Sequence, residues 1–217
     1  MRICFIGDSF VNGTGDPDCL GWTGRICATA RRAGHDLTHY NLGIRRETSA
    51  QIRARWREEA FRRLPHSEPA GLVFSFGTND TTLEDGRERV PPAESRGHAA
   101  AILGEAAVRC PVLMVGPPPL ADAEQNRRIA ALSEQFERLC EQLHVPYLPV
   151  IEPLLRSHAW LAEAAAGDGA HPGARGYAEL AALVQGWPAW QTWLSGTPHP
   201  PAAGPAGQRG AEPRTTE

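Results

Sequence analysis

Ser9 and His171 are the two residues whose types and surroundings could support nucleophilic catalysis. Ser9 follows a short apolar run, and a serine at a sharp strand-to-helix turn can expose its hydroxyl group as a nucleophile. His171 lies in a glycine-rich loop, three residues after Asp168 and directly before Pro172, which favours an extended backbone. The Asp168 carboxylate could bind one nitrogen of the His171 imidazole and so fix its tautomer, while the other imidazole nitrogen faces Ser9. Taken singly, each residue also has a structural interpretation. The Ser9 hydroxyl could serve a turn or cap a helix, and Asp168 could cap its loop.

Transfer of an acyl group also needs hydrogen-bond donors for the oxygen that becomes negatively charged. Gly43 ends the second apolar run, and no side chain shields its backbone N–H. Asn79 follows the third run and carries a carboxamide, and the backbone N–H of Ser9 is a further candidate. Gly43 could instead serve a turn and Asn79 an Asx turn. Their shared position after predicted strands favours the functional interpretation.

Arg45 and Arg46 follow Gly43 closely. Both could point to solvent at the start of a helix. Alternatively, one of them could bind an anionic group of a substrate, such as a carboxylate or a phosphate.

The neighbouring loops carry three further acids, Asp16, Asp18 and Asp80. A calcium or magnesium site is conceivable there, but acids in loops are usually solvated, so we expect no metal. Trp22 and Phe76 could form the wall of an acyl pocket, although core packing suits Phe76 better.

Hydrophobic periodicity predicts the elements that position these residues. Short apolar runs predict five strands, at residues 2–7, 37–42, 72–76, 111–115 and 145–150. Spacings of three and four residues, together with alanine-rich composition, predict helices over 20–33, 47–64, 93–109, 124–143, 152–165 and 174–185. Residues 8–19 are expected to form a loop. The alternation predicts one parallel sheet covered on both faces, with the ligand site beyond the carboxyl ends of its strands.

The last part of the chain divides into two segments. Trp187, Trp190 and Trp193 are spaced three apart, and we expect them to pack a terminal helix onto the body; a ligand platform is the alternative. Residues 196–217 are rich in proline, glycine and alanine without periodicity, which predicts a disordered tail. Residues 1–195 would then form one domain.

Composition excludes several classes of function. The 217 residues include 41% hydrophobic and 22% charged residues, a normal composition for a soluble globular domain. The net charge is −3, so no general positive field attracts nucleic acid or an anionic membrane. All 22 basic residues are arginine, which excludes a Schiff-base lysine and a P-loop lysine. Five scattered cysteines without a CxxC pair, and the lack of a signal-like apolar run, favour reduced thiols and a cytoplasmic location.

Four short blocks, in order, resemble those of the GDSL-type esterases and lipases of the SGNH hydrolase superfamily. They are Gly7-Asp8-Ser9-Phe10, Asn41-Leu42-Gly43, Gly77-Thr78-Asn79-Asp80 and Asp168-Gly169-Ala170-His171-Pro172. The resemblance covers roughly residues 1–185. It implies a three-layer α/β/α, flavodoxin-like fold that hydrolyses esters without a metal or an organic cofactor.

The resemblance also implies a role for each matching residue. Ser9 would be the nucleophile, His171 the general base and then the general acid, and Asp168 the residue that orients His171. The oxyanion hole would consist of the Ser9 N–H, the Gly43 N–H and the Asn79 side chain. Hydrolysis would proceed through an acyl-enzyme on Ser9.

This sequence departs from the family pattern at two places. Phe10 stands where the family name has leucine, and Ile44-Arg45-Arg46 follows Gly43 where small residues are common. The segment 80–92 is strongly charged and would make a poor surface for a lipid interface. We therefore expect a small-molecule, water-soluble ester with a small or medium acyl group. An acyltransferase with the same triad, or a binding module without activity, remains the alternative.

Overall fold

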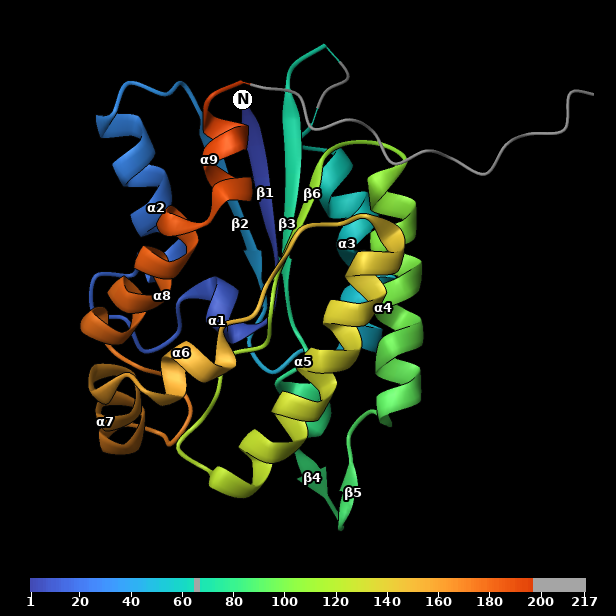
Figure 1. The fold of residues 1–217 in the computed structure, drawn as a ribbon, viewed down its shortest axis with the longest axis vertical. Helices are drawn as coiled ribbons and strands as arrows, with labels where there is room; N and C mark the ends of the chain where they lie inside the picture. Colours follow the sequence, from blue (N-terminus) through green and yellow to red (C-terminus); the bar gives the residue numbers. More distant parts are fainter. Residues whose placement is uncertain (65–66, 197–217) are drawn as a thin grey trace, which may run out of the picture.

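The computed structural model describes residues 1–64 and 67–196. Five parallel strands form its central sheet, in the order β2-β1-β3-β6-β7. These strands are β1 (Arg2–Gly7), β2 (Thr38–Gly43), β3 (Ala70–Ser75), β6 (Val112–Val115) and β7 (Tyr147–Leu148). Helices cover both faces of the sheet, which gives three α/β/α layers (Figure 1). The predicted parallel sheet and fold class are confirmed.

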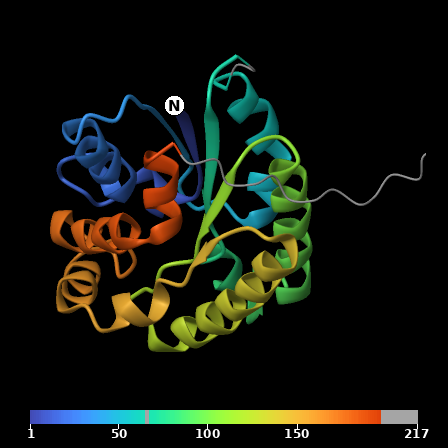
Figure 2. The same ribbon diagram turned by 45° about the horizontal axis from the view of Figure 1, so that its top comes forward.

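Two apolar cores lie on opposite faces of the sheet, because successive strand residues point to opposite sides. Phe5 contributes to one core, while Cys4 and Ile6 contribute to the other. The first core is covered mainly by α2 (Gly21–Arg32), α8 (Ala174–Gly186) and α9 (Pro188–Leu194). The second is covered by α3 (Ser49–Phe61), α4 (Pro92–Ala107) and α5 (Ala123–Leu143). Figure 2 shows these helix layers on either side of the strands.

The carboxyl ends of the three neighbouring strands β1, β2 and β3 are level with one another. Gly7 pairs with Gly43 of β2 on one side and with Ser75 of β3 on the other. The segments that follow these strands therefore meet at one edge of the sheet. This register places the predicted nucleophile loop beside the predicted oxyanion loops.

The last strand, β7, has two residues where the sequence predicted a strand over 145–150. Pro146 and Pro149 flank it. Proline has no N–H to donate to a neighbouring strand, so it confines the pairing to the residues between.

Two local predictions were wrong. The helix predicted over 152–165 is split into α6 (Ile151–Leu155) and α7 (His158–Ala166). Ser157 separates them, because its side chain accepts a hydrogen bond from the N–H of Trp160 and caps α7. The loop predicted over 8–19 begins with a short helix, α1 (Ser9–Asn12), which Asp8 caps in the same way.

The charged segment 80–92 contains more structure than the sequence indicated. A 3₁₀ turn, η1 (Asn79–Thr81), leads into a small antiparallel hairpin of β4 (Leu83–Glu84) and β5 (Arg87–Glu88). This hairpin lies beyond the carboxyl ends of the strands, at the lower edge of Figure 1.

The aromatic residues near the end pack as predicted. Trp190 and Trp193 are buried in the first core, and Trp187 is partly buried against it. Trp22 and Phe76 are fully buried, so the hypothesis that they form the wall of an acyl pocket was wrong. Apart from Gly196, the tail predicted over 196–217 lies outside the described residues. Within the described part of the chain, no helix is long and apolar enough to cross a membrane.

Candidate active site

Ser9 occupies the first position of α1, immediately after β1. The close approach of β1 to β3 requires glycine before this turn, since a Cβ atom on Gly7 would lie 1.9 Å from the carbonyl oxygen of Ser75. The side chain of Asp8 then accepts a hydrogen bond from the N–H of Phe10, at 3.0 Å, and starts the helix. Ser9 is thereby held at the wall of a cavity of about 600 Å³.

His171 and Asp168 meet Ser9 from a loop 162 residues away in the chain. His171 Nε2 lies 2.8 Å from Ser9 Oγ, and His171 Nδ1 lies 2.7 Å from Asp168 Oδ2. The other oxygen, Asp168 Oδ1, accepts the backbone N–H groups of Ala170 and His171, at 3.0 and 2.9 Å. The loop thus fixes both the carboxylate and the imidazole. The structure brings together all three residues that the sequence analysis selected.

Hydrogen bonding keeps Asp168 ionised. Burial would raise the pKa of this carboxyl group, but the donors from His171 and Ala170 outweigh that effect and lower the pKa to about 2. An ionised carboxylate beside Nδ1 favours the tautomer that leaves Nε2 free to accept a proton from Ser9.

Phe10 packs against the imidazole of His171. The centroid of its ring lies 5.1 Å from that of the His171 ring. The Phe10 ring also stacks on Trp160, with the two ring centroids 6.0 Å apart. Phe10 is buried, so its larger ring, at the position of the leucine in the family name, fills the space between α1 and α7.

The donors predicted for an oxyanion hole are only partly supported. Asn79 lines the cavity, but its Nδ2 group donates to Asp8 Oδ2 at 3.2 Å and to the carbonyl of Glu47 at 3.0 Å. The Gly43 N–H donates to the side chain of Asn41 at 3.0 Å, and Gly43 does not line the cavity. The structure therefore argues against Gly43 as a donor to the substrate.

Gly43 has a different structural role. A Cβ atom at this position would lie 2.2 Å from the N atom of Asn12. Glycine is needed because the end of β2 and the end of α1 are in close contact.

The two arginines after Gly43 both line the cavity, as does a third that the sequence analysis missed, Arg89. Arg45 Nη2 lies 3.2 Å from Asp168 Oδ2. Arg46 has a left-handed backbone conformation, with φ of 70°, and its carbonyl accepts a hydrogen bond from Arg89 at 3.0 Å. Arg89 belongs to the charged segment, and only the hairpin fold brings it to the site.

Arg55 positions three segments around the site, and no sequence pattern marked it. Its Nη2 group donates to the carbonyl of Gly7, the last residue of β1, at 3.1 Å, and to that of Leu42, the residue before the last of β2, at 2.9 Å. Its Nε group donates to Glu47 Oε2 at 2.7 Å, and the Glu47 carbonyl in turn accepts from Asn79. One guanidinium group thus ties the nucleophile turn to the loop that holds Asn79.

A second contact between a serine and a histidine lies outside the cavity. Ser49 Oγ is 2.9 Å from His98 Nδ1, and the Ser49 N–H donates to Asp80 Oδ1 at 2.8 Å. Ser49 and Asp80 are fully buried. No substrate can reach Ser49, so we assign this group to packing of α3 against η1.

The expectation that the loop acids are solvated was wrong for two of them. Asp80 is fully buried, and Asp16 is buried in an ion pair with Arg25. Asp18 is largely exposed and also pairs with Arg25, at 3.0 Å. Among residues 1–64 and 67–196, no group of three His, Cys, Asp or Glu side chains could hold a metal ion.

Asp8 is a buried carboxyl group next to the candidate nucleophile. Burial raises its pKa to about 7, and the nearby carboxylates of Asp80 and Glu47 act in the same direction, against the N–H of Phe10. Asp8 therefore changes its protonation state near neutral pH inside the folded protein.

The first prediction concerns stability as a function of pH. Between pH 3.8 and about 7, folded Asp8 keeps a proton that the unfolded chain releases, so its contribution to the free energy of unfolding falls as the pH rises. The full effect would be of the order of a few kcal/mol. In the Asp8→Asn variant, the free energy of unfolding should therefore fall less between about pH 4.5 and about pH 7.5 than it does in the wild type. Urea unfolding at these two pH values measures the difference.

Asp36→Asn is the matched control, because the Asp36 side chain is 97% exposed. It should retain the wild-type difference in unfolding free energy between the two pH values. An Asp8→Asn variant with the same difference as wild type would contradict the prediction.

Comparison with known proteins agrees with the geometry. The model of the GDSL-like lipase/acylhydrolase family matches residues 5–179. The chain resembles a lipase/acylhydrolase from Enterococcus faecalis, with 21% identity, a TM-score of 0.70, and coverage of 85% of this chain and 93% of that one. It also resembles TesA, with 23% identity, a TM-score of 0.71, and coverage of 89% and 100%.

A third solved structure has the same fold. It is Axe2, an acetylxylan esterase from Geobacillus stearothermophilus, with 16% identity, a TM-score of 0.70, and coverage of 87% of this chain and 95% of that one. A search of the curated proteins found no match. Because the family model spans most of the chain and the fold agrees, this protein belongs to the GDSL-like lipase/acylhydrolase family.

Proposed function

We propose that this protein hydrolyses carboxylic esters through an acyl-enzyme on Ser9. The observation that carries the proposal is the continuous line of contacts from Ser9 Oγ to His171 Nε2, 2.8 Å, and from His171 Nδ1 to Asp168 Oδ2, 2.7 Å. It lies at the wall of a cavity that can admit a small ester. Membership of a hydrolase family supports the same chemistry.

The geometry suits a two-step reaction. His171 Nε2 takes the proton from Ser9 Oγ as this oxygen attacks the carbonyl carbon, and Asp168 stabilises the resulting imidazolium. His171 then gives the proton to the leaving alcohol, which departs and leaves the acyl group on Ser9. In the second step His171 takes a proton from water, the hydroxide oxygen attacks the acyl carbon, and Ser9 recovers its proton from His171.

Three donors are proposed for the oxyanion. The Ser9 N–H lies in the first turn of α1, where backbone N–H groups have no intrahelical acceptor. Asn79 would exchange one of its two present acceptors for the substrate oxygen. In place of Gly43 we propose the backbone N–H of Arg46, because Arg46 lines the cavity and its N–H has no backbone acceptor among the described residues. One such donor typically contributes about 3 kcal/mol to the transition state.

The proposed substrates are water-soluble esters with a small or medium acyl group. The cavity is lined by short apolar side chains, such as Ala121 and Ala170, and by several charged ones. The adjoining hairpin carries Glu84, Arg87 and Glu88, which is an unfavourable surface for a lipid interface. The solved structure of Axe2 shows that an acetylxylan esterase uses this fold.

Covalent labelling tests the proposal. The wild-type protein, incubated with a fluorophosphonate, should gain one adduct by intact-mass spectrometry, and peptide mapping should place it on Ser9. The same preparation should hydrolyse p-nitrophenyl acetate. A folded protein that neither labels nor hydrolyses the ester would overturn the hydrolase assignment and favour a binding module instead.

A further inference from the structure

Three arginine residues line the same cavity as Ser9. They are Arg45, Arg46 and Arg89, and the cavity also contains the carboxylates Asp122 and Asp168. The formal charge of these five groups is +1, and Glu84, which pairs with Arg89 at 3.2 Å, balances it. A guanidinium without a carboxylate partner beside a nucleophile attracts substrates that carry a negative charge.

Both carboxylates already have donors from the protein. Asp122 Oδ1 accepts the backbone N–H groups of Glu124 and Gln125, at 2.8 and 3.1 Å, and caps α5. Asp168 accepts from His171, from Ala170 and from Arg45. Among the arginines, Arg45 is therefore paired with Asp168, whereas Arg46 and Arg89 are not paired with either carboxylate.

Arg46 is held by its backbone rather than by its side chain. Its left-handed conformation, with φ of 70°, is supported by the hydrogen bond from Arg89 to its carbonyl. Arg89 is itself fixed by an ion pair with Glu84, 3.2 Å, and its side chain is only 17% exposed. The guanidinium of Arg46 has no acidic partner among the described residues. Arg127 and Arg138, in contrast, pair with glutamates on their own helix, α5.

We propose that Arg46, supported by Arg89 and Arg45, forms a subsite for an anionic group of the ester, a carboxylate or a phosphate. A guanidinium offers a planar pair of donors that matches either group. The inference rests on the proposed ester hydrolysis and adds the substrate class. The preferred substrates are then esters with a negative charge near the scissile bond.

Two matched substrate pairs test the proposal and locate the charge. Para-acetoxybenzoate and para-acetoxybenzamide have nearly the same shape, but only the first carries a charge, on its alcohol side. The mono-p-nitrophenyl ester of adipate and its terminal amide provide the same comparison on the acyl side. The quantity measured is the ratio of kcat/KM for the acid to kcat/KM for the amide within each pair.

In the wild type we expect this ratio to be about ten in at least one pair, since a hydrogen bond to a charged group contributes roughly a tenfold preference. The ratio should fall in about 0.5 M sodium chloride, because salt screens a partly exposed charge. Arg46→Gln should lower it by about fivefold or more, mainly through the KM of the acid, and Arg46→Lys should restore part of it.

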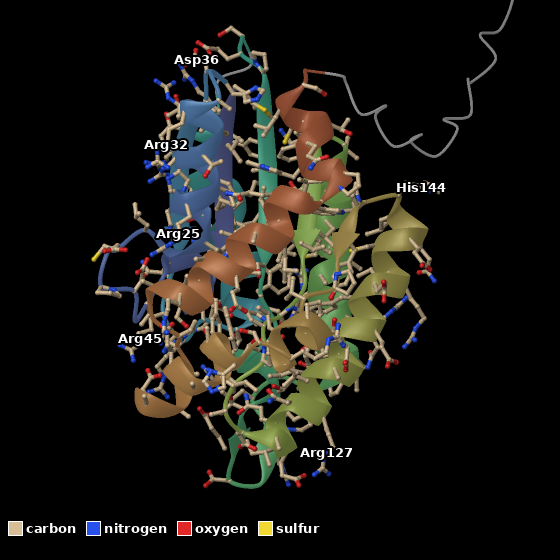
Figure 3. The ribbon with its side chains drawn as sticks, turned by 60° about the vertical axis from the view of Figure 1, so that its left-hand side comes forward. Arg25, Arg32, Asp36, Arg45, Arg127 and His144 are labelled. Atoms are coloured by element: carbon tan, nitrogen blue, oxygen red, sulfur yellow. The ribbon has the colours of Figure 1, made fainter. Side chains whose placement is uncertain are left out.

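Arg127→Gln is the matched control, because it removes the same charge from an exposed position on α5. Figure 3 shows Arg127 well apart from Arg45. Its ratios should equal those of the wild type. Ratios near one in both wild-type pairs, or an Arg46→Gln ratio equal to that of the wild type, would overturn the subsite. Failure to hydrolyse any of the four esters or p-nitrophenyl acetate would instead overturn the proposed function.

Discussion

Replacing Ser9 with alanine should lower kcat for p-nitrophenyl acetate by about 10⁴-fold to 10⁶-fold. The reason is that Ser9 Oγ is the group placed 2.8 Å from the candidate base, at the wall of the cavity. Without this oxygen no acyl-enzyme forms, and the remaining hydrogen-bond donors can only assist direct attack by water. The variant should also gain no fluorophosphonate adduct, as measured by intact mass.

The chain offers a demanding control for this experiment. Ser49 also contacts a histidine, His98, at 2.9 Å, and an aspartate, Asp80, accepts its N–H. Ser49 is fully buried and does not line the cavity, so Ser49→Ala should retain turnover and labelling. If Ser9→Ala kept more than about one hundredth of the wild-type kcat, Ser9 would not be the nucleophile.

The sheet could be predicted because its strands carry local signals, whereas the roles of the three central site residues could be predicted because four short blocks, in order, resemble those of the GDSL-type family. Apolar runs that end in glycine marked β1 and β3, and such runs are buried when a parallel sheet is covered on both faces. The loop from Asp168 to His171 is short, so a carboxylate–imidazole contact is possible within it, but the pair alone is also typical of a loop cap. Ser9 was then placed opposite this loop by the general rule that ligands bind at the carboxyl ends of parallel strands.

The residues that the sequence could not reveal depend on contacts between distant segments. The Gly43 N–H was expected to face the substrate, but the side chain two residues earlier, Asn41, accepts it. In the sequence, Arg55 resembles any exposed arginine of a helix. Its role depends on the fold, which places the carbonyls of Gly7 and Leu42 beside its guanidinium. Asp80 was expected to be a solvated loop acid, but in the structure η1 places it in contact with Ser49, whose N–H it accepts.

The second large effect is expected for His171. Replacing it with glutamine should lower kcat about as much as Ser9→Ala, by about 10⁴-fold or more, because the imidazole is the base for Ser9 and the acid for the leaving alcohol. The rate of fluorophosphonate labelling should fall with it, since Ser9 remains in place but loses its proton acceptor. Stopped-time labelling followed by intact mass measures this rate directly.

A double variant makes the prediction more specific. Ser9 and His171 act as one unit, so the effects of their loss should not add: Ser9→Ala combined with His171→Gln should be about as active as either single variant. His98→Gln is the matched control, because it removes the other histidine that contacts a serine, and it should retain kcat. A double variant in which the two losses multiply would show that His171 and Ser9 act independently. The 2.8 Å contact would then be structural, and the base for Ser9 would have to be another group at the cavity.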